Sequence, residues 1–269
     1  MTRAEGIMMQ SLVRDGVRLA YDQRGEGEPG MVFVHGWCCD HSFFQPQVEH
    51  FARRHRVVTV DRRGHGASDK PAGVYHPDVF AADTAWLIEQ LGLDRPVVVG
   101  HSMGGVVALR LAHLFPESLS ALIALDAGWV LPAAFDEVGP AVSAGLTRAD
   151  YADQLRAVMG AMFGEHDDPD RRRRFLDTMA SARQDVMHSE WQQTIENTDT
   201  ETPLAHLQVP TLYIAADNPL ADLERLRTYE QVSIGQTVGS GHFHQFEVPD
   251  QVNGMIDRFL TLHGRTAVR

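Results

Sequence analysis

The chain has 269 residues, of which 43% are hydrophobic and 22% charged, and its 36 acidic and 24 basic residues give a formal net charge of −12. This balance argues against nucleic acid or an anionic membrane as the main partner. No stretch is apolar enough to span a bilayer, and the N-terminus lacks the apolar segment of a signal peptide. Cys38 and Cys39 are adjacent and are the only cysteines, so we predict no disulfide framework and a cytoplasmic location.

The first half of the chain alternates apolar runs with stretches of helical periodicity. Two strands that turn at Asp15-Gly16 are predicted in SLVRDGVRLAYDQRG. Buried strands are then predicted at 31–36, 56–61, 97–101 and 119–126, and helices at 44–53, 77–91 and 103–115. Strands that are apolar on both faces and alternate with helices are typical of a parallel sheet covered on both sides.

Residues 127–203 interrupt this alternation with several amphipathic helical stretches and no convincing strand. One helix is expected to begin near Asp168 and to expose the basic run at 171–174. Further elements are predicted as strands at 210–216 and 232–239 and as helices near 220–229 and at 249–263. We therefore predict an α/β core domain (1–126 and 204–269) with a mostly parallel, doubly wound sheet of about eight strands, and a helical insertion over the sheet.

The run VVVGHSMGG at 97–105 carries the clearest chemical signal. A G-x-S-x-G pattern between a strand and a helix places the serine on a sharp turn, which Gly100 and Gly104 allow to close. The hydroxyl of Ser102 would then project above the carboxyl ends of the strands, where ligands bind in such sheets. Ser102 is therefore the candidate nucleophile, and the alternative is an ordinary tight turn with an incidental serine.

A serine nucleophile needs a base that takes its proton. Among the 14 histidines, His242 in VGSGHFHQFEVPD is the best placed, because it follows the last predicted strand in a glycine-rich loop at the same sheet edge as Ser102. His244 is the rival candidate. His101 is adjacent to the serine, but its side chain should point into the protein and have a structural role.

The oxyanion that forms on the substrate needs hydrogen-bond donors. The stretch VHGW ends a predicted strand with Gly36 and Trp37, and the main-chain N–H groups of Trp37 and Met103 would face the negative oxygen. Gly36, His101 and, from the insertion, Trp129 are the residues that we expect beside the substrate.

Four motifs follow one another along the chain: HGW at 35–37, DRRGHGASD at 61–69, GHSMGG at 100–105 and GSGHF at 239–243. With these motifs the chain resembles the α/β-hydrolase superfamily over nearly its whole length. The resemblance implies Ser102 as nucleophile, His242 as base, and residues 127–203 as a cap. It also implies the oxyanion hole named above, and a loop-fixing role for residues 61–69.

The acid that would pair with His242 is where the sequence departs from the family pattern. Most relatives place it after the next-to-last strand, usually as G-x-x-D-P, but that segment here is IAADNPLAD, in which Asp217 is the candidate. Some members use an aspartate after the preceding strand, where LIALDAG supplies Asp126. Either carboxylate would fix the tautomer of His242 and stabilise its imidazolium. We favour Asp126 and keep Asp217 as the alternative.

Three functions fit this pattern. The leading one is a cofactor-free serine hydrolase that cleaves a carboxylic ester or lactone through an acyl-enzyme on Ser102. The second rests on GWCCDHSFF at 36–44, which is similar to a stretch in the cofactor-independent dioxygenases that open 3-hydroxy-4-oxoquinoline rings, although Cys39 replaces a histidine. Those enzymes pair their histidine with an aspartate at the position of Asp126, and their serine is not a nucleophile. The third is a non-catalytic ligand receptor, which steady turnover of an ester would contradict.

The insertion holds the only indication of the substrate. Its adaptable apolar side chains would line a chamber for a hydrophobic or aromatic group, or pack within the insertion itself: Trp129, Phe135, Met159, Met162, Phe163, Met179, Met187 and Trp191. The expected partner is thus a small apolar molecule, and no metal or cofactor is expected. The sequence leaves the oligomeric state open, with a homodimer among the options.

Overall fold

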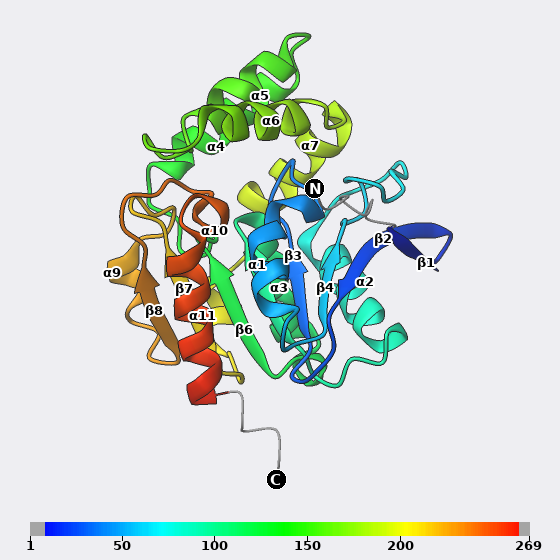
Figure 1. Ribbon diagram of the computed structural model, residues 1–269. Helices are drawn as coiled ribbons and strands as arrows, with labels where there is room; N and C mark the ends of the chain where they lie inside the picture. Colours follow the sequence, from blue (N-terminus) through cyan, green and yellow to red (C-terminus); the bar gives the residue numbers. More distant parts are fainter. Residues whose placement is uncertain (1–8, 264–269) are drawn as a thin grey trace.

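The computed structural model describes residues 9–263, which form an eight-stranded sheet covered by helices, with more helices above the carboxyl ends of the strands (Figure 1). The strand order across the sheet is β1 (Gln10–Arg14), β2 (Val17–Arg24), β4 (Val57–Val60), β3 (Met31–Val34), β5 (Val97–His101), β6 (Ala121–Leu125), β7 (Thr211–Ala215) and β8 (Val232–Gln236). β2 pairs antiparallel with both β1 and β4, and the remaining pairs are parallel. The predicted fold class is confirmed.

The inner strands are apolar on both faces because helices cover both sides of the sheet. Every residue of β3, β5 and β6 is buried, as expected for parallel strands. The covering helices are α1 (Gln45–Phe51) and α11 (Pro249–His263) on one side, and α2 (Pro77–Gln90) and α3 (Met103–Leu114) on the other (Figure 1). At the sheet edge, Asp15 and Gly16 have φ values of 51° and 78° and form the predicted hairpin turn.

Residues 127–203, all of which belong to the described part of the chain, contain helices and no strand. The helices that begin in this segment are α4 (Phe135–Leu146), α5 (Tyr151–Gly160), α6 (Pro169–Ala180), α7 (Gln184–Trp191), the π-helix η3 (Gln192–Glu196) and α8 (Glu201–Ala205). α4 to α7 lie above the carboxyl ends of the strands (Figure 1), and we refer to residues 127–203 as the cap. α6 begins where the sequence predicts, because the Asp168 carboxylate accepts hydrogen bonds from two N–H groups of its first turn.

The C-terminal part of the chain differs in detail from the prediction. α9 (Leu223–Leu226) is a single turn instead of a helix over 220–229, because Asp222 caps it and the residues before it form a loop. β8 ends three residues early, since the chain turns at Gly239, where φ is 72°. α10 (His244–Glu247) was not predicted. No helix in residues 9–263 is long and apolar enough to cross a membrane.

Candidate active site

Ser102 lies on a strained turn between β5 and α3. Its φ and ψ of 54° and −123° are values that a residue with a side chain rarely adopts. Main-chain hydrogen bonds hold this conformation, because the Ser102 N–H donates to Leu125 O at 2.9 Å and the Ser102 carbonyl accepts from Gly105 N at 2.9 Å. The turn directs Ser102 into the cavity described below.

The turn closes only because Gly100 and Gly104, two positions before and after the serine, have no side chains. A Cβ added to Gly100 would lie 2.3 Å from the carbonyl oxygen of Gly104. One added to Gly104 would lie 2.1 Å from the carbonyl oxygen of Val34, on the neighbouring strand β3. α3 can therefore start directly against the sheet.

Gly104→Ala is expected to lower the free energy of unfolding by more than about 3 kcal/mol, because main-chain atoms of β3 cannot move away from the new methyl group. Thermal unfolding followed by circular dichroism measures the effect. The matched control is Gly254→Ala in α11, where an added Cβ meets no atom within 4 Å; alanine should stabilise that helix by up to about 1 kcal/mol. A G104A protein with the wild-type melting temperature would contradict this packing argument.

His242 and Asp126 form a buried pair. The Nδ1 atom of His242 lies 2.7 Å from Oδ2 of Asp126, and the two side chains are 4% and 0% exposed. Asp126 directly follows β6, and its other carboxylate oxygen accepts from the N–H groups of Ala216 at 3.3 Å and Leu220 at 3.2 Å. Because a carboxylate only accepts, His242 carries its hydrogen on Nδ1 and leaves Nε2 free to take a proton.

Asp217, the alternative acid, does not take part in this pair. Its side chain is exposed, and its carboxylate accepts from the N–H of Gly239 at 3.3 Å. The physical reason is its place in the loop after β7, because Ala216 before it is buried and faces Asp126 while Asp217 faces solvent.

The loop that carries His242 is bonded to the cap. The N–H of His242 donates to Met162 O at 2.8 Å. Two glycines bring the main chains together, because a Cβ on Gly241 would lie 2.3 Å from the nitrogen of Gly164. The carboxylate of Glu247 accepts from both glycine N–H groups, at 2.7 and 3.1 Å. These contacts, which the sequence did not predict, fix the position of the candidate base.

The two neighbouring histidines, His101 and His244, are buried and are not among the residues that line the cavity. His101 is buried, and its Nε2–H donates to the carbonyl oxygen of His242 at 3.0 Å. We predict His101 beside the substrate, and the structure places its ring against the loop that carries His242. Burial, followed by the nearby His242, holds the pKa of His101 well below its usual value. Burial also lowers the pKa of His244 to about 4, so both rings are neutral at pH 7.

The expected oxyanion donors lie beside Ser102. Met103 is the first residue of α3, so its N–H has no acceptor within the helix. Trp37 follows β3, and both residues line the same cavity as Ser102. The indole of Trp37 donates to Met187 O at 3.1 Å and contacts Trp191 with a ring separation of 4.8 Å, so its side chain is fixed against the cap.

The two other residues expected beside the substrate have structural roles. A Cβ on Gly36 would lie 3.1 Å from the Cβ of Ser102, so Gly36 makes room for the serine and does not itself line the cavity. Trp129 is only 2% exposed; its indole donates to Gly105 O at 2.9 Å and its ring packs against Tyr213. The sequence predicts Trp129 beside the substrate, and the structure places its side chain in the core.

An apolar cavity of about 240 Å³ lies between the cap and the sheet. Ser102 and His242 are its polar lining residues, and no acidic, lysine or arginine side chain is among the described residues that line it. The remaining lining residues are Trp37, Met103, Val106, Gly128, Leu131, Phe135, Val138, Val142, Val158, Met159, Met162, Trp191, Ile195 and Leu220. Some apolar cap residues therefore line the cavity, such as Met159 and Trp191. Others, such as Phe163, Met179 and Met187, are buried elsewhere.

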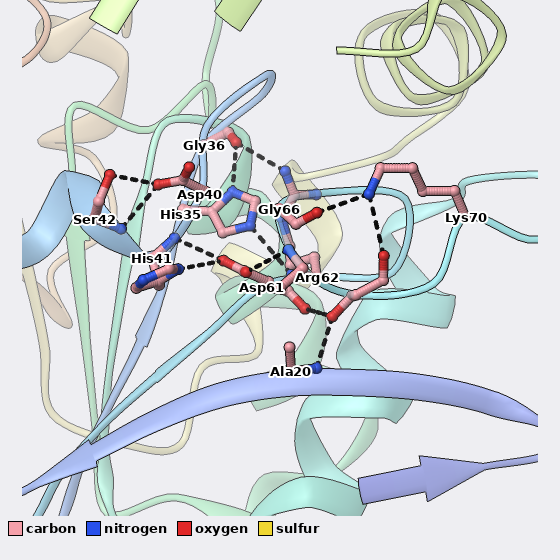
Figure 2. Close-up of polar contacts among 12 residues, drawn as sticks. Ala20, His35, Gly36, Asp40, His41, Ser42, Asp61, Arg62, Gly66 and Lys70 are labelled. Atoms are coloured by element: carbon pink, nitrogen blue, oxygen red, sulfur yellow. Dashed lines mark hydrogen bonds and ion pairs between the residues drawn. The ribbon is translucent and has the colours of Figure 1, made fainter. Parts of the chain in front are cut away.

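Polar contacts hold residues 61–69 in place, and Figure 2 shows those of Asp61, Arg62 and Gly66. The buried carboxylate of Asp61 accepts from the N–H and Nδ1 of His41 at 2.8 and 2.9 Å, and from the N–H of Ala67 at 2.8 Å. A Cβ on Gly66 would lie 2.2 Å from this carboxylate. Burial alone would raise the pKa of Asp61, but the hydrogen bond and charge of His41 outweigh it and lower the pKa.

Comparison with known proteins supports the fold. A family model described as alpha/beta hydrolase fold matches residues 29–249. An AB hydrolase superfamily protein of Bacillus subtilis is 29% identical over 262 residues, which cover 90% of this chain and 95% of that protein. Epoxide hydrolase 1 of Caenorhabditis elegans is 29% identical over 280 residues, which cover 91% of this chain and 68% of the relative. The solved enol-lactonase of Burkholderia xenovorans superposes with a TM-score of 0.84 at 21% identity, over 94% of this chain and 100% of that one. The chain belongs to the alpha/beta hydrolase fold family.

Proposed function

We propose that the protein is a serine hydrolase that cleaves a neutral, apolar carboxylic ester or lactone, and that it forms an acyl-enzyme on Ser102. The observation that carries the proposal is the buried contact of 2.7 Å between His242 and Asp126, at a cavity lined by both Ser102 and His242. A nucleophile, a base and an acid that orients the base then belong to one site.

The reaction needs only groups of the chain and a water molecule. Ser102 Oγ attacks the carbonyl carbon while His242 Nε2 takes its proton, and Asp126 stabilises the imidazolium. The negative oxygen accepts hydrogen bonds from the N–H groups of Trp37 and Met103. When the carbon–oxygen bond to the leaving group breaks, His242 returns the proton to the alkoxide. It then removes a proton from the water that attacks the acyl group, and finally protonates Ser102.

The lining of the cavity supports a neutral substrate. A free carboxylate in this space would lose its hydration without meeting a cation, and even an unpaired neutral polar group costs about 1–3 kcal/mol when it is buried in a protein. A volume of about 240 Å³ lies below the range of about 300–1,000 Å³ that is common for drug-sized ligands, which favours a short acyl chain or a single ring.

A pair of esters of equal length tests this proposal. We expect kcat/KM for p-nitrophenyl pentanoate to exceed that for p-nitrophenyl hemiglutarate, which ends in a carboxylate, by about 100-fold or more, equivalent to about 2.7 kcal/mol. A neutral lactone is the third substrate of the panel. Equal rates for the two esters would contradict the neutral-substrate class. Absence of turnover across the panel would contradict the hydrolase itself and favour the receptor.

The dioxygenase is retained as a second candidate because the partner of His242 lies after β6, at the position that those enzymes use. Cys39, which replaces their histidine, is buried, and its thiol donates to Trp37 O at 3.2 Å. Oxygen uptake with 3-hydroxy-4-oxoquinoline as substrate distinguishes the two candidates. Uptake that survives Ser102→Ala would favour the dioxygenase, since His242 then acts on the substrate directly.

A further inference from the structure

The carbonyl group of Gly36 is held unusually firmly. It accepts hydrogen bonds from Arg62 Nη2 at 2.9 Å and from His35 Nδ1 at 2.8 Å (Figure 2). It also accepts one from the N–H of Cys39 at 3.3 Å. His35 can only donate here, because its Nε2 accepts from the N–H of Arg62 at 3.1 Å. Burial and the charge of Arg62 hold the pKa of His35 well below its usual value, so the ring stays neutral in this role.

The Gly36 carbonyl and the Trp37 N–H belong to one planar peptide group. In a trans peptide these two bonds point in opposite directions, so a group that fixes the carbonyl also fixes the N–H. The carbonyl points to Arg62, and the N–H therefore points the other way. A carbonyl that accepts from a guanidinium is also polarised, which makes the attached N–H a better donor.

Arg62 is in turn held by the cap. Its guanidinium donates through Nη1 to Glu190 of α7 and lies over the ring of Phe80, 4.6 Å from the centroid. The side chains of Arg62 and Glu190 are 2% and 0% exposed, and the other Glu190 oxygen lies 2.9 Å from His65 Nε2. Burial would raise the pKa of Glu190, but Arg62 and then His65 outweigh it and lower the pKa, so the carboxylate is charged.

Such a buried ion pair is weak evidence for stability, because the cost of removing two charges from water offsets most of their attraction. The geometry gives this pair a different role. The Arg62 guanidinium bonds to Glu190 of the cap and to the carbonyl of the Gly36–Trp37 peptide group, and so connects the two. The contact spans 128 positions of sequence between Arg62 and Glu190, so it forms only when the cap is docked on the core.

We propose that Arg62, held by Glu190, is a positioning residue of the oxyanion hole: it orients the Trp37 N–H toward the oxygen that becomes negative during attack by Ser102, and it couples this orientation to docking of the cap. The inference rests on the proposed function. An interaction made only in the transition state changes kcat and leaves KM nearly unaltered.

The decisive variant is the double substitution Arg62→Met/Glu190→Met. It removes both charges and keeps apolar side chains of similar length, whereas removal of Arg62 alone would leave Glu190 buried without a partner. We expect kcat for p-nitrophenyl pentanoate to fall about 10- to 100-fold, since a donor that is misplaced by about 1 Å loses most of its effect, while KM stays within about threefold. Arg62→Lys keeps the positive charge, but its single ammonium cannot bond to both Glu190 and Gly36. Its kcat should therefore fall, but less than that of the double variant.

Two further measurements separate this role from a structural one. Arg63→Met is the matched control, because the Arg63 guanidinium donates to Asp83 at 2.5 and 2.7 Å, whereas that of Arg62 donates to Gly36 O. Its kcat should match the wild type even if its melting temperature falls. The affinity for a phenylboronic acid, whose adduct on Ser102 mimics the tetrahedral intermediate, should fall by the same factor as kcat in the double variant.

A double variant that has kcat and boronic acid affinity within about twofold of wild type would overturn the inference. So would a fall of kcat in Arg63→Met equal to that in Arg62→Lys, because the effect would then belong to the loop as a whole. Failure of the proposed function gives a different result, since the wild type would then turn over none of the esters, or Ser102→Ala would retain activity.

Discussion

Replacing Ser102 with alanine is expected to lower kcat for p-nitrophenyl pentanoate by about 10⁴-fold or more, because the variant loses the covalent route and retains only binding and the oxyanion donors. No other hydroxyl or thiol is among the described residues that line the cavity. Steady-state kinetics on the purified variant measure the loss, and its circular dichroism spectrum should match the wild type.

The matched control for this experiment is Ser118→Ala. Ser118 ends a short 3-10 helix before β6, at the opposite end of the sheet from Ser102, and its hydroxyl donates to Phe115 O. This variant should keep wild-type kcat. If Ser102→Ala retains more than about 1% of the wild-type kcat, the serine does not form an acyl-enzyme, since the expected loss is at least 100 times larger.

Asp126→Asn is expected to lower kcat by about 10⁴-fold, because an asparagine amide donates to Nδ1 of His242, stabilises the wrong tautomer and supplies no charge to the imidazolium. The fold should survive, since the amide oxygen can still accept from the N–H groups of Ala216 and Leu220, which now bond to Asp126. Kinetics at pH 7 with the neutral ester measure the effect.

Asp217→Asn is the natural comparison for that variant. Asp217 is exposed and accepts from the N–H of Gly239, a bond that an asparagine oxygen can also accept. Its kcat should stay within about twofold of wild type, as for most surface substitutions. The opposite ranking, with Asp217→Asn severe and Asp126→Asn mild, would contradict the pairing of His242 with Asp126.

Much of the core was predictable because its signals are local. Apolar runs such as VVTV in β4 are buried on both faces, and the glycine pattern around Ser102 requires a sharp turn wherever it follows a strand. The acid was harder to choose, because Asp126 and Asp217 both follow parallel strands at one sheet edge. Side-chain direction decides between them, and it depends on loop conformation that no short pattern encodes.

The rest of the site was harder to predict, because it depends on the path of the chain through the cap. Trp129 and Trp191 are both large aromatic residues of the cap, yet Trp129 packs into the core while Trp191 lines the cavity. Glu190 did leave a signal in the sequence, since it lies on the same face of α7 as the buried Val186 and Met187. A charged residue on an apolar helix face indicates a buried partner, but only the tertiary structure identifies that partner as Arg62.

The cap contributes directly to both halves of the candidate catalytic machinery. Met162 O accepts from the N–H of His242, and Glu190 holds Arg62 against the Gly36 carbonyl. The candidate base and the loop of the proposed oxyanion hole therefore take their positions from the cap as well as from the sheet. For this reason we propose that the cap is part of the site as well as its cover.

Mass spectrometry after reaction with diisopropyl fluorophosphate tests whether Ser102 is a nucleophile activated by His242. We expect one dialkylphosphoryl group per chain on the peptide that contains Ser102, formed much more slowly in His242→Ala and absent in Ser102→Ala. Ester turnover in a protein that acquires no such group, or acquires it at another residue, would contradict the claim.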